Sequence, residues 1–110
     1  MDGLNMLDDA IQEYYSKNGN RHIRKFKSSE NKDWGWHYLH YLVDRRHVIR
    51  YGIGQDRNVW VGGLELAIGP SYFEAADFWS YANSERFTLE ASTEGVERNL
   101  ALLDEFLGYK

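Results

Sequence analysis

Between Trp34 and Ile68 the chain reads WGWHYLHYLVDRRHVIRYGIGQDRNVWVGGLELAI, a stretch that is rich in β-branched and aromatic residues and contains no proline. Such a composition is typical of β-strands. Turn-like segments divide the stretch into three predicted strands, at 34–43, 47–53 and 59–68. The dividing segments are DRR at 44–46 and GQDRN at 54–58. Connections this short join antiparallel neighbours, so the stretch predicts an antiparallel meander.

The residues before the meander predict a helix and a short strand. Apolar residues from Leu4 to Tyr14 recur three and four positions apart, which marks one face of an amphipathic helix. Gly19 provides a C-terminal stop for this helix. The polar, basic segment that follows contains a short predicted strand at 23–26.

The residues after the meander begin with a predicted helix. Ser71 and Glu74 have the spacing of a capping box, in which each side chain satisfies a free backbone N–H of the first helical turn. We therefore expect a second helix over 72–82.

The C-terminal segment completes the predicted fold. A short strand is expected over 86–90, followed by a helix that Thr93 caps and Gly108 closes. The whole chain, residues 1–110, is then a single α+β domain. It has an antiparallel sheet of about four to five strands, with two to three helices packed on one face.

The composition agrees with a folded domain and excludes cysteine chemistry. Of the 110 residues, 43% are hydrophobic and 15% aromatic, which is enough to build a core without covalent staples. The absence of cysteine excludes disulfide frameworks, thiolate nucleophiles and cysteine-ligated zinc. The N-terminal residues lack the pattern of a signal peptide, and no apolar run is long enough to cross a bilayer. A cytoplasmic protein is therefore expected.

Alternation along the three predicted strands separates two faces of the sheet. One face is almost purely hydrophobic and is assigned to the core: Leu39, Tyr41, Val43, Ile49, Tyr51, Ile53, Trp60, Leu64, Leu66 and Ile68. The opposite face mixes aromatic and charged side chains: Trp34, Trp36, Tyr38, His40, Val48, Arg50, Val61 and Glu65. Trp, Tyr and Arg supply most hot spots of protein interfaces, so this face is a candidate binding surface. Two alternatives are that the N-terminal strand or loop covers it, or that a one-residue slip in register exchanges the two faces.

The glycine pairs and the histidines give no catalytic or metal-binding motif. The segment GIGQDR at 52–57 begins like a dinucleotide-binding fingerprint, but it lacks the third glycine and leads into a strand, so we interpret it as a hairpin turn. Gly62-Gly63 inside a strand indicates a bulge or a close backbone approach. No histidine pair has the spacing of a metal site, and no serine stands in a nucleophile elbow. We expect no metal, no cofactor and no small-molecule substrate.

One enzymatic arrangement stays open as an alternative. His40, Arg50 and Glu65 could share one sheet face next to Tyr38, where the histidine and the carboxylate would perform acid–base work. The arginine would then stabilise the charge of a phosphorane-like transition state, as in small microbial ribonucleases. Surface ion pairs are the commoner reason for such groupings.

A second alternative is a nucleic-acid or regulatory adaptor that uses the basic run RHIRKFK at 21–27. Lysines that protect an edge strand from aggregation explain the run equally well. The net charge of −4 disfavours direct nucleic-acid binding. Residues 59–110 contain only three Lys or Arg against nine Asp or Glu, which favours a basic partner.

The segment SYFEAADFWSYANSERFTLE at 71–90 is both acidic and rich in aromatic residues. Glu74 and Asp77 stand one helical turn apart in the predicted second helix, among five large aromatic residues. A helix that buries only one face needs fewer large aromatic residues than this. Some of them are therefore expected to wedge into the core or to reach a partner.

This segment, the glycine-bearing strands before it and the Leu/Glu-rich helix after it resemble the C-terminal part of small bacterial immunity proteins. These proteins accompany polymorphic toxins, including those of contact-dependent growth inhibition systems. The resemblance lies in size, acidity, aromatic content and the α+β plan, and it covers about the last half of the chain. It implies tight neutralisation of one cognate toxin domain, often a nuclease with a basic active site.

The leading hypothesis is therefore a non-enzymatic immunity protein that occludes the basic active site of a cognate toxin. No contact residue is carried over from the family, so the expected ones follow from surface chemistry alone. They are Trp36, Tyr38, Arg50, Glu65, Glu74 and Asp77.

Overall fold

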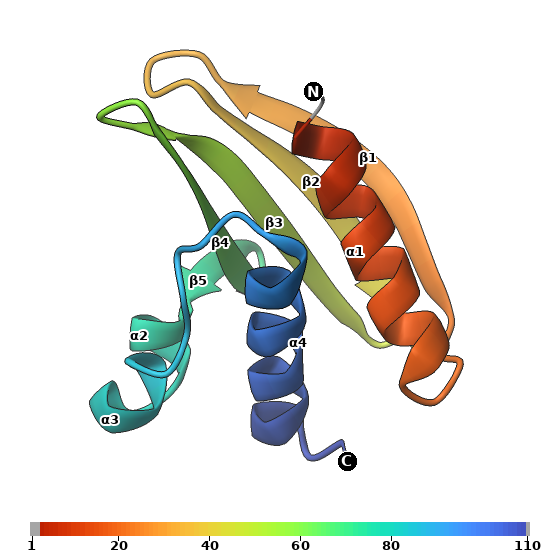
Figure 1. Cartoon of the computed structure of the whole chain (residues 1–110). Coiled ribbons are helices and arrows are strands. Elements are labelled where there is room, and N and C mark those ends of the chain that lie inside the picture. Colours follow the sequence, from red (N-terminus) through yellow and green to blue (C-terminus); the bar gives the residue numbers. More distant parts are fainter. Residues whose placement is uncertain (1–2, 110) are drawn as a thin grey trace.

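The computed structural model of the chain describes residues 3–109. It is an α+β fold whose nine elements follow one another along the chain (Figure 1). They are α1 (Gly3–Lys17), β1 (Ile23–Asn31), β2 (Trp36–Val43), β3 (His47–Asp56), β4 (Val59–Ile68), β5 (Ser71–Glu74), α2 (Ala75–Phe78), α3 (Tyr81–Ser84) and α4 (Thr93–Leu107). The five strands form one antiparallel sheet in the order β1-β2-β3-β4-β5, so the predicted meander is confirmed and extended.

Tight turns with positive backbone φ connect the central strands. Asp44 and Arg45 have φ of 54° and 57° between β2 and β3. Arg57 and Asn58 have φ of 52° and 67° between β3 and β4. Paired positive φ values match the right-handed twist of the flanking strands. The β3–β4 turn has two residues between the paired Asp56 and Val59, and the β2–β3 turn has three, 44–46, between the paired Val43 and His47. The hairpin turn expected over 52–57 lies later than predicted, because β3 continues to Asp56 and the turn consists of Arg57 and Asn58.

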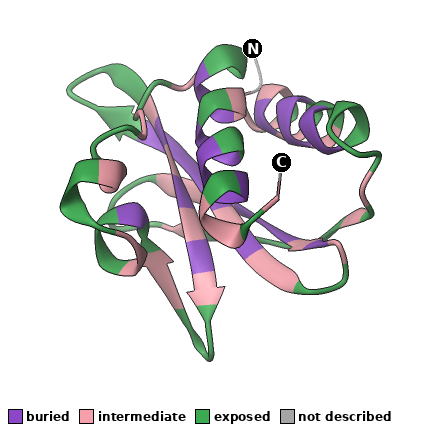
Figure 2. Cartoon of the chain, turned by 90° about the horizontal axis from the view of Figure 1, so that it is seen from below, coloured by how far each residue is buried: buried purple, intermediate pink, exposed green. Residues whose placement is uncertain are grey.

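The two long helices, α1 and α4, pack on the same side of the sheet (Figure 1). The predicted core face lies beneath them, and eight of its members are buried: Leu39, Tyr41, Val43, Ile49, Tyr51, Ile53, Leu64 and Leu66. Figure 2 shows the buried residues gathered in the two helices and the central strands, with exposed residues in the turns. The assignment of Trp60 and Ile68 to the core is wrong, because these residues lie at the two ends of β4 and are 46% and 50% exposed.

The predicted helix over 72–82 is wrong. Gly69, with φ of 61°, and Pro70 turn the chain so that Ser71 pairs with Ile68 and β5 runs back along β4. Ser71 and Glu74 are consequently strand residues rather than a capping box. Two four-residue helices follow instead, and Ser80 caps the second by accepting a hydrogen bond from the Asn83 backbone N–H at 3.3 Å.

The strand predicted over 86–90 is reduced to one isolated bridge between Val61 and Glu90. The buried side chain of Asn99 on α4 holds this segment instead. Its Nδ2 donates to the Thr88 carbonyl at 2.8 Å, and its Oδ1 accepts from the Thr88 N–H at 2.9 Å. The segment therefore obtains backbone hydrogen bonds both from this helix side chain and from β4, where the Gly62 N–H donates to the Leu89 carbonyl at 2.8 Å.

The ends of α4 match the prediction within one residue. Ser92, rather than Thr93, is the N-cap, and its side chain accepts from the Gly95 N–H at 3.0 Å. Gly108 ends the helix with a φ of 87°, as expected. In the chain from 3 to 109, no helix is both long and apolar enough to span a bilayer.

A buried ionic cluster joins the end of α1 to α4. The Arg21 guanidinium donates to both carboxylate oxygens of Asp104, at 2.9 and 2.6 Å, and stacks between the rings of Tyr15 and Tyr109. The Tyr14 hydroxyl donates to the same carboxylate at 2.7 Å. Burial, followed by the Asp104 carboxylate, raises the pKa of Tyr14, so this hydroxyl stays protonated and remains a donor. The cluster fixes the direction in which the chain enters β1.

Replacing Asp104 by Asn leaves Arg21 as a nearly buried charge without its partner. We expect Asp104→Asn to lower the free energy of unfolding by about 3 kcal/mol, measured by urea denaturation. The neighbouring Glu105 pairs with Arg86 on the surface at 2.6 Å, and such pairs contribute little. Glu105→Gln is therefore the matched control and should have a far smaller effect. Equal losses in the two variants would contradict the buried role of Asp104.

Candidate functional site

The candidate site lies on the sheet face opposite α1 and α4, which we call the outer face. Cross-strand pairing places five polar residues in one row across all five strands: Lys27, His40, Arg50, Glu65 and Glu74. Neighbours in such a row share a face. The predicted grouping of His40, Arg50 and Glu65 on adjacent strands is thus confirmed.

Arg50 is at the centre of this row and is held on three sides. Its Nε donates to Glu65 Oε1 at 3.0 Å, and its Nη2 lies 2.8 Å from the same oxygen. The guanidinium carbon lies 4.4 Å from the centre of the Tyr38 ring and 4.5 Å from that of Tyr72. Cation–π contacts and a charge-assisted hydrogen bond therefore hold the guanidinium in one place.

His40 is buried beside Arg50, with 3% of its surface exposed. Its Nε2 lies 2.7 Å from the Ser29 hydroxyl, and its Nδ1 lies 2.9 Å from the Tyr72 hydroxyl. Burial, then the positive charges of Lys27 and Arg50, lower the pKa of His40. The imidazole is therefore neutral at neutral pH, with both nitrogens engaged. Tyr72 reaches from β5 to a residue of β2, so its ring spans the sheet above Arg50.

Two aromatic rings extend the cluster toward the end of the sheet. Trp36 and Tyr38 are stacked, with ring centres 6.2 Å apart and planes 21° from parallel. They lie over the backbone of Gly52 and Gly54 in β3. A Cβ atom at Gly52 would be 2.6 Å from Tyr38 Cε1, and one at Gly54 would be 2.9 Å from Trp36 Cδ2. Because these glycines have no side chain, the two rings can lie directly on the backbone of β3. The sequence analysis did not predict this role.

The structure brings four of the six predicted contact residues together on the outer face. Trp36, Tyr38, Arg50 and Glu65 form one partly buried patch. Glu74 continues the row at β5 and is exposed. The sixth, Asp77, lies in α2 and is exposed, and no strand pairing places it in this row.

Two members of the cluster, Ser29 and Tyr72, were missed because β1 was expected to be shorter and 71–74 was expected to be helical. The alternation of Tyr72 with Glu74 was the available signal, since both point to the outer face once the segment is a strand. Trp34, predicted to belong to this face, lies instead in the turn between β1 and β2 and is 75% exposed. The strand that carries it was predicted two residues too long.

The arrangement determines what the cluster can do chemically. A general acid or base must exchange protons with a substrate, and both nitrogens of His40 are occupied within the protein. A shallow hollow of about 420 Å³ lies beside Tyr38 and Arg50, bordered by residues 29–33. No group of three or more metal-ligating side chains occurs among residues 3–109. In this arrangement both nitrogens of His40 are already hydrogen-bonded within the protein, whereas Tyr38 and Arg50 border the hollow.

The basic run at 21–27 does not form one basic surface. Arg21 turns inward to Asp104, and Lys25 lies 3.5 Å from Asp8 of α1. Arg24 and Lys27 are exposed on β1. The positive charges are thus divided between an internal ion pair and an edge strand, where lysines commonly protect free strand edges.

Gly52 and Gly63 are cross-strand partners with opposite surroundings. A Cβ at Gly52 collides with the Tyr38 ring, whereas a Cβ at Gly63 meets no atom within 4 Å. We expect Gly52→Ala to lower the free energy of unfolding by about 1–3 kcal/mol. Gly63→Ala should raise it by about 0.5 kcal/mol, because alanine restricts the unfolded chain. Thermal and urea denaturation measure the stability of both variants. A Gly52→Ala variant as stable as the parent would contradict the close packing of the Tyr38 ring on Gly52.

The folded protein holds His40 neutral, whereas the unfolded chain protonates it near pH 6.5. The native state therefore binds fewer protons, and its stability should fall as the pH drops below about 6.5 toward the lowered pKa of His40. We expect His40→Gln, which cannot titrate, to lose less stability than the parent between pH 7.5 and 5.5. Urea denaturation at both pH values measures the difference. Part of the dependence should persist in the variant, since burial also lowers the pKa of His47. An unchanged dependence would show that His40 titrates normally.

Comparison with known proteins gives no relative for this chain. It matches no family model, no curated protein and no solved structure. The candidate site therefore rests on the chemistry and geometry of its own residues.

Proposed function

We propose that this protein is an immunity protein that binds and neutralises a cognate bacterial toxin domain, most simply a nuclease with a basic active site. It would act without catalysis, in the cytoplasm, by covering that site with its outer face. One observation supports this proposal above all: the Arg50 guanidinium lies between the rings of Tyr38 and Tyr72. Arg50 also pairs with Glu65, and Tyr38 stacks on Trp36, all on the sheet face opposite α1 and α4.

The residue types of the outer face support a role in protein binding. Trp, Tyr and Arg dominate the hot spots of interfaces, and here they form one contiguous patch. Each is already held in place by a neighbour: Trp36 by Tyr38, Arg50 by Glu65, and Tyr72 by His40. A side chain that is ordered before binding loses little conformational entropy when the partner arrives. Such preorganisation favours tight association.

The charge distribution supports a basic partner. Glu65 and Glu74 face each other across β4 and β5, and Arg50 pairs with only the first of them. Asp77 adds a further exposed carboxylate in α2. Lys27 and Arg50 balance the two carboxylates of the row as a whole, but the exposed carboxylates of Glu74 and Asp77 are concentrated at β5 and α2. These carboxylates would attract a basic catalytic cleft and disfavour acidic competitors.

The proposal is tested first by finding the partner. The tagged protein is used to capture interacting proteins from its native bacterium, and mass spectrometry should identify a toxin domain. Adding the purified protein should then inhibit that toxin at a one-to-one ratio. If the protein alone cleaves RNA, and His40→Ala abolishes the cleavage, the ribonuclease alternative replaces the proposal.

Substitutions on the outer face then test the surface. We expect Tyr38→Ala to weaken toxin binding by roughly 30-fold or more, the effect of losing a hot spot of about 2 kcal/mol. Tyr38→Phe keeps the ring beneath Arg50 and should bind nearly as well as the parent. Glu94→Ala, exposed on α4, is the control on the helical side. Calorimetric titration measures all three, and equal affinity of the Tyr38→Ala variant and the parent would exclude the outer face as the interface.

A further inference from the structure

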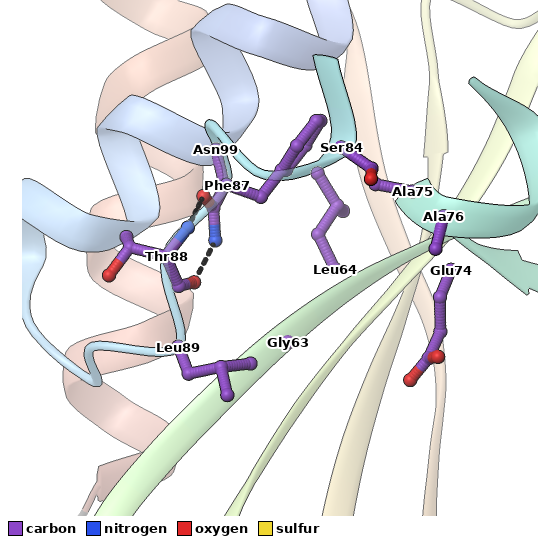
Figure 3. A pocket seen from close by; sticks show the side chains of 10 residues that line it. All are labelled: Gly63, Leu64, Glu74, Ala75, Ala76, Ser84, Phe87, Thr88, Leu89 and Asn99. Atoms are coloured by element: carbon purple, nitrogen blue, oxygen red, sulfur yellow. Dashed lines mark hydrogen bonds between the residues drawn. The ribbon is translucent and has the colours of Figure 1, made fainter. Parts of the chain in front are cut away.

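A second recess lies at the edge of β4, between β5 and the segment before α4. Pairing with β5 ends at Glu65 and Glu74, and the next contact along the β4 edge is the Val61–Glu90 bridge. Between them is a hollow of about 360 Å³ (Figure 3). Gly63 lies at its floor, where an added Cβ would meet open space. The missing side chain helps to create the recess.

The walls of this hollow are apolar and one of its borders is acidic. Leu64, Ala76, Phe87 and Leu89 contribute hydrophobic surface, and Leu89 is 65% exposed. Figure 3 shows the Leu89 side chain and the Glu74 carboxylate on opposite sides of Gly63. A ligand that fits must therefore combine an apolar stem with a positively charged end.

The Glu74 carboxylate is a site of uncompensated charge. It stands directly opposite Glu65, and like charges in such a pair repel each other. Arg50 engages Glu65, whereas none of the salt bridges found in residues 3–109 involves Glu74. A cation bound here would relieve the repulsion as well as pair with Glu74.

Hydrogen bonds from Asn99 hold the wall opposite β4 against α4. Asn99 is 1% exposed, and its amide holds both backbone groups of Thr88 and also donates to the Tyr51 hydroxyl at 2.9 Å. Phe87 and Leu89, on either side of Thr88, are thereby fixed in position relative to α4. A preformed recess of this kind is a suitable receptor for a single anchoring side chain.

We infer that the hollow receives an arginine side chain of the partner protein. The inference rests on the proposed function and adds the chemistry of one contact to it. The methylene stem of arginine would lie along Leu89, and its forked guanidinium would donate to the Glu74 carboxylate on the other side of Gly63. Lysine fits less well, because its compact ammonium cannot make a forked contact with the carboxylate.

The test uses the isolated full-length protein and needs no toxin. Nα-acetyl-arginine N-methylamide is titrated into ¹⁵N-labelled protein while amide shifts are followed by NMR. We expect saturable shifts at Gly63, Ala76, Thr88 and Leu89, with a dissociation constant on the order of 1–10 mM for so small a ligand. The citrulline analogue, a neutral molecule of the same shape, should cause none, and the lysine analogue should bind several-fold more weakly. Equal shifts with the citrulline and arginine analogues, or none with either, would overturn the inference.

Two variants test separately whether binding requires the Glu74 charge and the open space beside Gly63. Glu74→Gln should abolish saturable binding of the arginine probe, whereas Glu94→Gln, an exposed acidic position on α4, should not change it. Gly63→Val should also abolish binding, because it fills the recess and leaves every charge in place. Retained probe binding in both the Glu74→Gln and Gly63→Val variants would exclude this site.

The outcome is distinguishable from that of the proposed function. If a toxin binds the outer face but tolerates Glu74→Gln and Gly63→Val without loss of affinity, the arginine inference fails and the proposed function stands. If the arginine probe binds as expected but no toxin is captured or inhibited, the recess stands as an arginine-binding site and the proposed function fails.

Discussion

The register of β2, β3 and β4 is the constraint on which the rest of the structure depends. Tight turns with positive φ set this register, pairing Leu39 with Tyr51 on the core face and His40 with Arg50 on the outer face. Because side chains alternate, a slip of one residue would move the arginine into the core and the tyrosine to solvent. Burial of the core residues under α1 and α4 therefore also determines which groups appear on the outer face.

The outer face is more ordered than the solvent side of a sheet requires. A sheet covered on one side needs only polar residues on the other. Here Arg50 is enclosed by two rings and a carboxylate, and His40 is almost completely buried between two hydroxyl groups. Removing a histidine and an arginine from water costs free energy that local hydrogen bonds only partly return.

The outer face and the edge recess both contain positions without side chains. Gly52 and Gly54 let Tyr38 and Trp36 lie flat on β3, and Gly63 leaves the space beside Glu74. In each case the absence of a Cβ decides where a larger group can lie. Gly52, Gly54 and Gly63 therefore lie inside strands, where they leave room for neighbouring groups, and do not mark turns.

The sequence by itself determined the elements whose periodicity is strong and local: α1, α4, the three central strands and the hydrophobic core face. Their apolar spacing allows only one amphipathic structure each. It also brought His40, Arg50 and Glu65 to one face, because alternation within neighbouring strands needs no long-range information. Only the tertiary structure decided the segment 71–90. A local capping pattern favoured a helix from residue 72, but residues 71–74 instead pair with the open edge of β4, which satisfies backbone groups of both strands. It likewise decided that Tyr72 would cross the sheet to His40 and that Asn99 would hold the segment around Thr88, because contacts between residues 32 and 11 positions apart depend on packing that no local pattern records.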